Sequence, residues 1–341
     1  MTDIKRILLL VVIVLSFYVL YKLVENRRII ITEYETEKKE GSSSSPKKEN
    51  FEAMPRISPS ASMQYPLREY TIMSSWNSAT DANLKVSLAA LVNVLNKGYR
   101  LIDLEIYLVD NIPNVGFSTQ STYDSMESTP IPFLDVCKQI MLTAFLTNNG
   151  SDPLFINLRI KSNNPTIFEK LANIFESECK TRLYPKTVNE KTILSTLKGK
   201  LIIIVDRNYY PQSDTYKCSA PTCKKDFKKM INMYSGTPDL QTWSVLDKMN
   251  QPTLPLKITN NGYTNVGKIQ MMIHGMGSMN IASNGSEFAA LLKKYSIQIY
   301  PHKVYSNDGN LTKYEDLFIN NGRRAFVPLA IAYSYVKDLV D

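Results

Sequence analysis

The sequence predicts an α/β protein with a mostly parallel sheet, preceded by a membrane anchor and a linker. From about residue 67 onward, short apolar runs alternate with amphipathic helical stretches, which is typical of strands joined by helices. The run at residues 201–205 is apolar on both faces, as buried parallel strands are. This alternation alone does not distinguish a closed barrel from an open, doubly wound sheet.

The predicted anchor is an apolar stretch at residues 7–21 that follows two basic residues and precedes Lys22. If the Lys22 side chain extends to the interface, the helix continues to Val24 and reaches about 27 Å, close to a hydrocarbon core of roughly 30 Å. No small-residue cleavage site follows, which favours an uncleaved anchor over a signal peptide. We therefore expect residues 1–28 to be an N-terminal membrane anchor with a single transmembrane helix, which places the protein in a membrane.

Residues 29–66 are rich in serine, lysine and proline, so we expect a flexible, disordered linker. The remaining residues 67–341 are numerous enough for one domain with a full hydrophobic core. The formal net charge of +8 suits ordinary solubility, an anionic membrane surface or nucleic acid, and it identifies none of these partners.

The elements of the globular part follow from the spacing of apolar residues. Apolar residues at intervals of three or four predict helices, and short β-branched runs predict strands. Asn164 and Pro165 provide an N-cap followed by proline at the first helical position. The expected strands are 70–74, 99–109, 154–160, 201–205, 269–273 and 296–300, and the expected helices are 84–95, 133–146, 165–179 and 286–294. Residues 207–270 contain no recognisable motif.

Four cysteines are too few for a disulfide scaffold in a chain of this length. Cys137 and Cys179 lie in apolar helical patterns and are expected in the core. Cys218 and Cys223 lie five residues apart in a polar stretch, where a local disulfide is plausible in an oxidising compartment. A metal site there would need two further ligands, which the neighbouring sequence does not offer.

A basic run surrounds these two cysteines. Its lysines either face anionic lipid headgroups or form a solvated helix face. Because no aromatic residues alternate with them, we do not expect nucleic acid as a partner. The run consists of Lys217, Lys224, Lys225, Lys228 and Lys229.

Five segments of the chain form a recognisable series of motifs. They are Ser74-Ser75-Trp76-Asn77, Gly98-Tyr-Arg-Leu-Ile-Asp-Leu-Glu105, Pro113-Asn-Val-Gly-Phe117, Pro153-Leu-Phe-Ile-Asn-Leu-Arg159 and Leu197-Lys-Gly-Lys-Leu-Ile-Ile203. In this order they resemble the X region of phosphoinositide-specific phospholipase C over residues 67–206, and residues 265–335 weakly resemble the Y region. The family's fold is a distorted TIM-type (β/α) barrel, so the resemblance implies a closed barrel for residues 67–341.

The resemblance places Trp76 and Phe117 at the positions of the family's two catalytic histidines. In the family, one histidine acts on the inositol 2-hydroxyl and the other assists the leaving group. Neither Trp nor Phe exchanges a proton near neutral pH, so both acid–base groups are missing. The chain's two histidines, His274 and His302, lie in the weakly matched third, and a relocated catalytic histidine is the less expected alternative.

The family's calcium ligands are also altered. Asn77 is retained, and Asp103 and Glu105 carry the two acids in swapped order on one face of a strand. The fourth position holds Arg159, which shares a strand face with Asn157. We hypothesise that its guanidinium lies between the acids in place of the metal; alternatively, Arg159 extends out of the barrel mouth.

The candidate pocket residues are Asn77, Asp103, Glu105, Asn157 and Arg159. If the site is active, Asn77, Asp103 and Glu105 are its expected calcium ligands; otherwise no cofactor is expected. Ile204 stands where the resemblance implies a phosphate-contacting lysine.

The leading functional hypothesis is a membrane-anchored, catalytically impaired phospholipase C-like protein that binds a lipid headgroup, for example an anionic one, or a protein partner. Two alternatives remain open. The first is an active phosphodiesterase that acts on phosphoinositides with rearranged catalytic groups. The second is a structural membrane protein whose pocket is filled by aromatic side chains.

Overall fold

The computed structural model describes residues 57–60, 63–118, 129–209, 216–218, 225–259, 262–274 and 284–340. They lie in one compact unit, Pro55–Asp341. In these ranges no helix is long and apolar enough to cross a membrane. The predicted anchor at residues 1–28 lies outside the described residues, as does most of the predicted linker.

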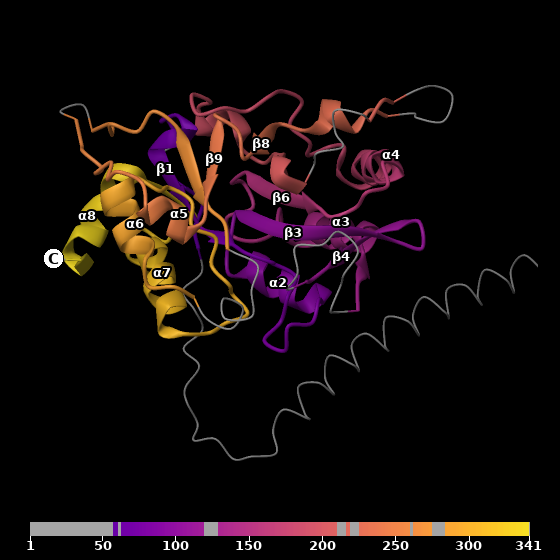
Figure 1. Ribbon diagram of the computed structural model, residues 1–341, viewed down its shortest axis with the longest axis horizontal. Helices are drawn as coiled ribbons and strands as arrows, with labels where there is room; N and C mark the ends of the chain where they lie inside the picture. The colour runs from indigo at the N-terminus through magenta and orange to yellow at the C-terminus, as the bar shows by residue number, and fades with distance from the viewer. Residues whose placement is uncertain are drawn as a thin grey trace, which may run out of the picture. The chain divides into compact units, whose positions relative to one another are not determined.

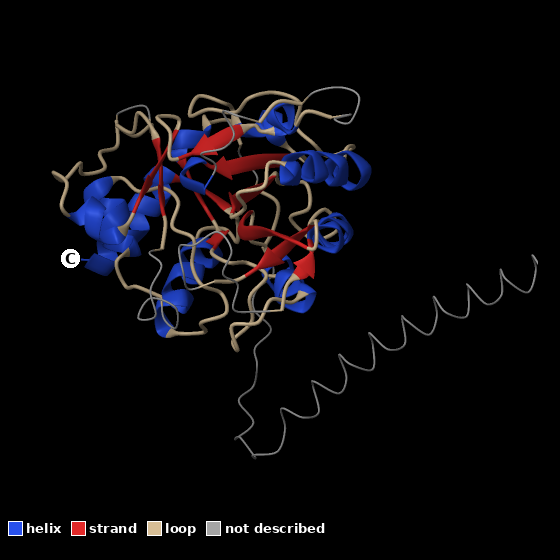
Figure 2. Cartoon of the chain, turned by 45° about the vertical axis from the view of Figure 1, so that its right-hand side comes forward, coloured by secondary structure: helices blue, strands red, loops and turns tan. Residues whose placement is uncertain are grey.

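Seven strands form one continuous parallel ladder, so the predicted parallel sheet is confirmed (Figure 1). Helices lie mainly on the outer side of these strands (Figure 2). The apolar runs predicted as strands form the central strands of the sheet. Both faces of these strands are buried, which explains why their sequences are apolar. In ladder order, the strands are β2 (Ser74–Ser75), β3 (Leu101–Val109), β6 (Leu154–Ile160), β7 (Leu201–Asp206), β8 (Met233–Ser235), β9 (Leu240–Trp243) and β10 (Ile269–Met272).

The segment at residues 299–302 closes the ladder into a barrel. Ile299 forms a parallel bridge with Met271 of β10, and His302 forms a parallel bridge with Ser75 of β2. The main-chain N–H groups of Met272 and Trp76 donate to the carbonyl oxygens of Ile299 and His302, at 2.8 and 2.9 Å. The sheet is therefore closed, as a TIM-type barrel requires.

This closing segment differs from the regular strand predicted at residues 296–300. It makes a single bridge to each neighbour, and the two bridges are three residues apart. Pro301 lies between them and has no N–H to donate to a ladder. The closure is consequently the most distorted part of the barrel.

The remaining strands lie outside the ring. β4 (Ile112–Gly116) pairs antiparallel with β3 and with β5 (Ile131–Pro132). β1 (Tyr70–Ile72) pairs antiparallel with β11 (Phe326–Pro328), which joins the start of the domain to its end.

The predicted helices are present with shifted ends. The first begins at Leu88 rather than residue 84, because the Ser87 hydroxyl caps it by accepting from the N–H of Ala90 at 3.1 Å. The helices are α2 (Leu88–Asn96), α3 (Phe133–Thr143), α4 (Thr166–Ile174), α5 (Val245–Met249), α6 (Phe288–Tyr295), α7 (Gly309–Asn320) and α8 (Leu329–Val340). A π-helical turn (Phe175–Cys179) extends α4, and short 3₁₀ turns span Leu67–Glu69, Leu194–Leu197, Arg207–Tyr209 and Phe227–Met230.

The predicted end of the linker at residue 66 is wrong, because residues 57–60 and 63–66 pack on the barrel. Ile57 is buried against Gly98, and Ser60 donates from both its N–H and its hydroxyl to Asp152 at 3.0 Å. The packing of this segment could not be predicted from its polar composition, because its hydrogen bonds are made to residues far away in the sequence. Gly98 and Asp152 precede the barrel strands β3 and β6, so this segment packs at the N-terminal end of these strands.

Cys137 and Cys179 are buried free thiols, as expected for core residues. Cys218 is disulfide-bonded. Its expected partner, Cys223, lies outside the described residues.

Replacing Gly98 by alanine should destabilise the domain. Gly98 has φ +92°, and an added Cβ would lie 2.6 Å from the Ile57 Cβ. Gly262 is the matched control, because its φ is +75° but no described atom lies within 4 Å of an added Cβ. Chemical denaturation of the full chain should show that Gly98→Ala lowers the free energy of unfolding by about 1–3 kcal/mol more than Gly262→Ala. Equal losses would mean that Ile57 does not pack at this position.

Candidate functional site

The candidate site lies at the C-terminal ends of the barrel strands, where TIM barrels carry their active sites. Alternate side chains of β3 and β6 point into the barrel mouth. In the parallel register, Asp103 is opposite Asn157, and Glu105 is opposite Arg159. All four side chains are buried. The spacing of two residues seen in the sequence therefore brings the acids and the arginine together.

Arg159 is at the centre of the cluster. Its Nε donates to both carboxylate oxygens of Asp103 at 3.1 Å, and its Nη1 donates to Glu105 Oε1 at 2.7 Å. Its Nη2 donates to Asp103 Oδ1 at 2.6 Å and to the side-chain oxygen of Asn77. The predicted contact between the guanidinium and both acids is confirmed. Because the side chain is 0% exposed, the alternative in which Arg159 extends into solvent is wrong.

Three further side chains donate hydrogen bonds to the carboxylates of Asp103 and Glu105. Asn157 Nδ2 donates to Asp103 Oδ2 at 2.7 Å. Lys161 Nζ donates to Glu105 Oε2 at 2.9 Å, and the Tyr107 hydroxyl donates to the same oxygen at 2.6 Å. Each of the four carboxylate oxygens therefore accepts at least one hydrogen bond, as buried charges require. The sequence analysis missed Lys161, although it continues the alternation of residues 157 and 159.

The ion pairs keep the cluster charged. Burial alone would raise the pKa of Glu105, but Arg159 and Lys161 outweigh burial and hold that pKa below its ordinary value. Burial alone would lower the pKa of Arg159, and Asp103 and Glu105 reverse that effect and raise it. Arg159 and Glu105 therefore stay ionised at neutral pH.

The two positions implied for catalytic histidines hold buried aromatic residues. The Arg159 Cζ lies 3.9 Å from the centre of the Trp76 ring, a cation–π contact. Trp76 also meets His274 edge to face, with 5.3 Å between ring centres. Phe117 is buried and directly follows Gly116, which is paired with Glu105. Trp76 and Phe117 cannot transfer a proton at neutral pH.

These residues do not fit a calcium ion in the arrangement observed. Calcium needs six to eight oxygen ligands at 2.3–2.6 Å. The side-chain oxygens of Asn77, Asp103 and Glu105 already accept from Arg159, whose positive charge lies where the ion would bind. Within the described ranges, no group of three or more His, Cys, Asp or Glu residues is arranged to hold a metal.

Asp206, at the end of β7, is a site residue that the sequence analysis missed. It is fully buried, and its Oδ1 accepts from the Asn208 N–H at 2.9 Å. Among the described residues, its Oδ2 has no hydrogen-bond partner. Burial raises the pKa of Asp206 to about 6, and the Arg159 charge only partly opposes this. The sequence signal that could have identified Asp206 is its position directly after the apolar run at residues 201–205.

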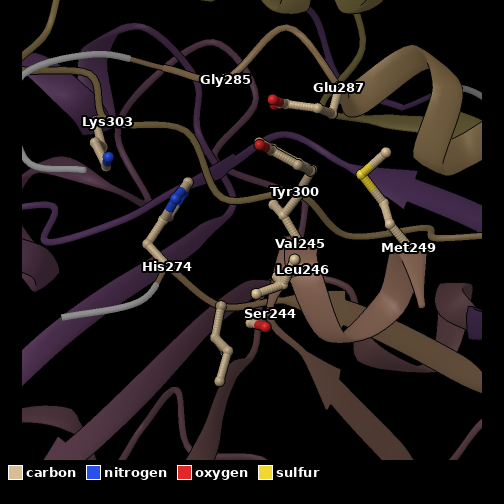
Figure 3. A pocket seen from close by; sticks show the side chains of 10 residues that line it. Ser244, Val245, Leu246, Met249, His274, Gly285, Glu287, Tyr300 and Lys303 are labelled. Atoms are coloured by element: carbon tan, nitrogen blue, oxygen red, sulfur yellow. The ribbon is translucent and has the colours of Figure 1, made fainter. Parts of the chain in front are cut away.

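A cavity of about 530 Å³ lies beside the ends of β9 and β10, whereas the Arg159 cluster is on β3 and β6. Figure 3 shows the residues that line it. His274, which touches Trp76, is in its wall and connects it to the Arg159 cluster. The lining residues are Ser244, Val245, Leu246, Met249, Ile273, His274, Gly285, Glu287, Tyr300 and Lys303. The cavity therefore combines apolar, basic and acidic side chains, as ligand sites do.

The two histidines have different surroundings. His274 lines the cavity, whereas His302 is fully buried and stacked on Tyr314, with ring centres 3.8 Å apart. Burial lowers the pKa of each histidine to about 3, so both are neutral at pH 7.

Asp206→Asn should stabilise the protein at pH 7.5. The folded-state pKa of about 6 lies above the ordinary value, so the ionised form is disfavoured in the fold. The penalty is about 3 kcal/mol at high pH, and it disappears as the pH falls through 6 to below 4. Denaturant unfolding across this range should show a gain for Asp206→Asn that vanishes near pH 4. The exposed Asp239→Asn is the control, and a gain independent of pH would contradict the assignment.

Comparison with known proteins identifies the family of the first half of the barrel. Residues 63–207 match the family model of the phosphatidylinositol-specific phospholipase C X domain, close to the predicted X-like residues 67–206. No curated protein sequence is significantly similar to the chain.

Two solved structures share the fold. PLC21 from L. pealei is 16% identical, with a TM-score of 0.58 over 80% of this chain and 38% of its own. PLC21 from S. officinalis is 15% identical, with a TM-score of 0.58 over 84% of this chain and 39% of its own. The chain thus spans less than two fifths of these proteins. The predicted resemblance is confirmed: residues 63–207 match the X domain of phosphatidylinositol-specific phospholipase C, and the chain shares the fold of the two PLC21 structures.

Proposed function

We propose that the protein is a membrane-anchored phospholipase C-like barrel that has lost the family's calcium-dependent cleavage and binds a phosphate-bearing lipid headgroup. The observation that carries this proposal is the position of Arg159, whose guanidinium is bonded to Asn77, Asp103 and Glu105. The apolar stretch at residues 7–21 supports the membrane anchor.

The loss of cleavage follows from the chemistry that remains in the cluster. Phosphodiester cleavage by the family's route needs proton-transfer groups and a divalent ion that activates the attacking hydroxyl. Trp76 and Phe117 supply no proton transfer, and each general acid or base contributes about 10²–10⁴-fold to rate. Arg159 is a fixed cation that cannot be displaced cheaply, because breaking a buried ion pair costs about 3–5 kcal/mol.

Binding is supported by the cavity, which the Arg159 cluster does not fill. Its volume of about 530 Å³ is within the range of small-molecule sites, and it opens at the functional end of the barrel. Lys303 in its wall supplies a positive charge suited to a phosphate. A headgroup can therefore bind beside the cluster without requiring a metal ion.

A second candidate function, hydrolysis by rearranged groups, is favoured by one observation. His274 lines the cavity and contacts Trp76, which stands at a family histidine position. As a neutral imidazole it has a nitrogen able to accept a proton. This candidate requires a histidine-dependent and metal-independent rate.

The full chain in a non-ionic detergent should release no inositol phosphate from phosphatidylinositol or its phosphates, with calcium or with a chelator. The wild-type protein should also show no calcium-dependent rise in melting temperature. In contrast, Arg159→Glu should gain such a rise, because this change frees the oxygens of Asn77, Asp103 and Glu105 and adds a carboxylate. Arg159→Gln is the control, since it removes the cation without adding a ligand.

Calcium-dependent turnover that Asp103→Asn abolishes would overturn the proposed loss of cleavage. Turnover that persists in chelator and disappears in His274→Gln would instead establish the second candidate. If Arg159→Glu does not fold, calorimetric titration of the wild type with calcium decides the metal question alone.

A further inference from the structure

Opposite charges face each other across the cavity. In Figure 3, Lys303 and His274 extend into the space from one side, and Glu287 and Tyr300 extend into it from the other. Glu287 precedes α6, whereas Tyr300 and Lys303 come from the segment that closes the barrel. The two walls therefore differ in charge.

The acidic wall is held in place by its surroundings. The Tyr300 hydroxyl is hydrogen-bonded to Glu287, and burial followed by the Glu287 charge raises the pKa of Tyr300, so the hydroxyl keeps its proton and donates. The Glu287 carboxylate lies over Gly285, where an added Cβ would be 1.9 Å from Oε2 and 3.1 Å from the Tyr300 oxygen. Glycine at residue 285 leaves this space to the carboxylate, which a side chain there would displace.

The basic wall is equally well positioned. The Lys303 N–H donates to Asn284 Oδ1 at 2.7 Å, and Asn284 Nδ2 donates to the Lys303 carbonyl at 3.1 Å. Burial lowers the pKa of Lys303 to about 8, which leaves most of its ammonium protonated at pH 7. His274 is neutral, and its Nε2 is bonded to the Pro301 carbonyl at 2.6 Å, so this nitrogen carries the hydrogen. Lys303 is therefore the positive charge of this wall.

Among the described residues, the charges in and beside the cavity disfavour a polyanion. Arg159 and Lys161 are both paired with the cluster acids, and Asp206 adds a further buried carboxyl group. A multiply phosphorylated ligand in the cavity would meet Lys303 on one side and the Glu287 carboxylate on the other. Like charges in a partly desolvated site repel strongly, so such a ligand is selected against.

We propose that the cavity binds a phosphate ester that carries an ammonium group, with its phosphate at Lys303 and its ammonium at Glu287 and Tyr300. This inference rests on the proposed headgroup binding and names its ligand class. The sequence allowed an anionic lipid headgroup or a protein partner, and this inference names a zwitterionic headgroup instead. Val245, Leu246 and Met249 line the same cavity and provide apolar contacts for the carbon chain between the two charges.

The test is isothermal titration calorimetry of the full chain in a maltoside detergent, which itself carries no phosphate or ammonium. The probes are O-phosphoethanolamine, ethyl phosphate and myo-inositol 1-phosphate. Ethyl phosphate matches the first probe except for the ammonium group. We expect O-phosphoethanolamine to bind at least tenfold more tightly than either of the other two, because its ammonium forms a charge-assisted hydrogen bond.

Variants assign the two ends of the ligand. Glu287→Gln should remove the preference for O-phosphoethanolamine while leaving the affinity for ethyl phosphate unchanged. Lys303→Met should weaken both probes about equally. Lys294→Met, an exposed lysine on α6, is the control and should change neither. Nanodiscs containing phosphatidylethanolamine then distinguish the source: competition with the soluble probe indicates a lipid headgroup, and lack of competition indicates a soluble ester.

Equal affinity for ethyl phosphate and O-phosphoethanolamine would overturn the inference. Tighter binding of myo-inositol 1-phosphate would also overturn it, but would leave the proposed headgroup binding intact. Calcium-dependent hydrolysis of phosphoinositides would instead overturn the proposed loss of cleavage without touching the ligand preference. Failure of all three probes to bind would remove both the inference and the proposed binding function.

Discussion

The ion pairs that Arg159 makes with Asp103 and Glu105 are the interaction on which the barrel mouth depends. Three oxygen-bearing side chains from β3 and from the loop after β2 converge on one planar, permanently charged group. Because the cluster is excluded from water, no member can be removed without leaving a buried charge uncompensated. The guanidinium thus neutralises the acids as a bound ion would, but it is covalently part of the chain and cannot dissociate.

This fixed cation divides the mouth into two halves with different chemistry. The half formed by β2, β3 and β6 is fully occupied by paired charges and by the Trp76 ring. The half formed by β9, β10, α6 and the closing segment keeps a cavity lined by both charges and by apolar side chains. Because the cluster acids are bonded internally, Lys303 and Glu287 are the charged groups among the described residues of the cavity wall. Binding without metal chemistry is the function that this division favours.

Local patterns in the sequence predicted most strands and helices, because short apolar runs and helical periodicity depend only on nearby residues. The residues of the Arg159 cluster were also predictable from strand alternation and family resemblance. The segment at residues 57–60 was not, since its hydrogen bonds are made to Asp152 and to the loop at Arg323. Lys161 and Asp206 were missed for a related reason. The sequence does not indicate whether a charged side chain at the end of a strand is buried.

The sequence by itself determined the alternating α/β pattern, the absence of histidines at both family positions and the presence of Arg159 at the position implied for a fourth calcium ligand. Only the tertiary structure decided that the sheet closes, because closure rests on two isolated bridges made by residues 299–302 rather than on a recognisable strand. It also decided which acids Arg159 neutralises, and that Lys303 faces Glu287 across a cavity. These features depend on distances between residues far apart in the chain, which composition and periodicity do not encode.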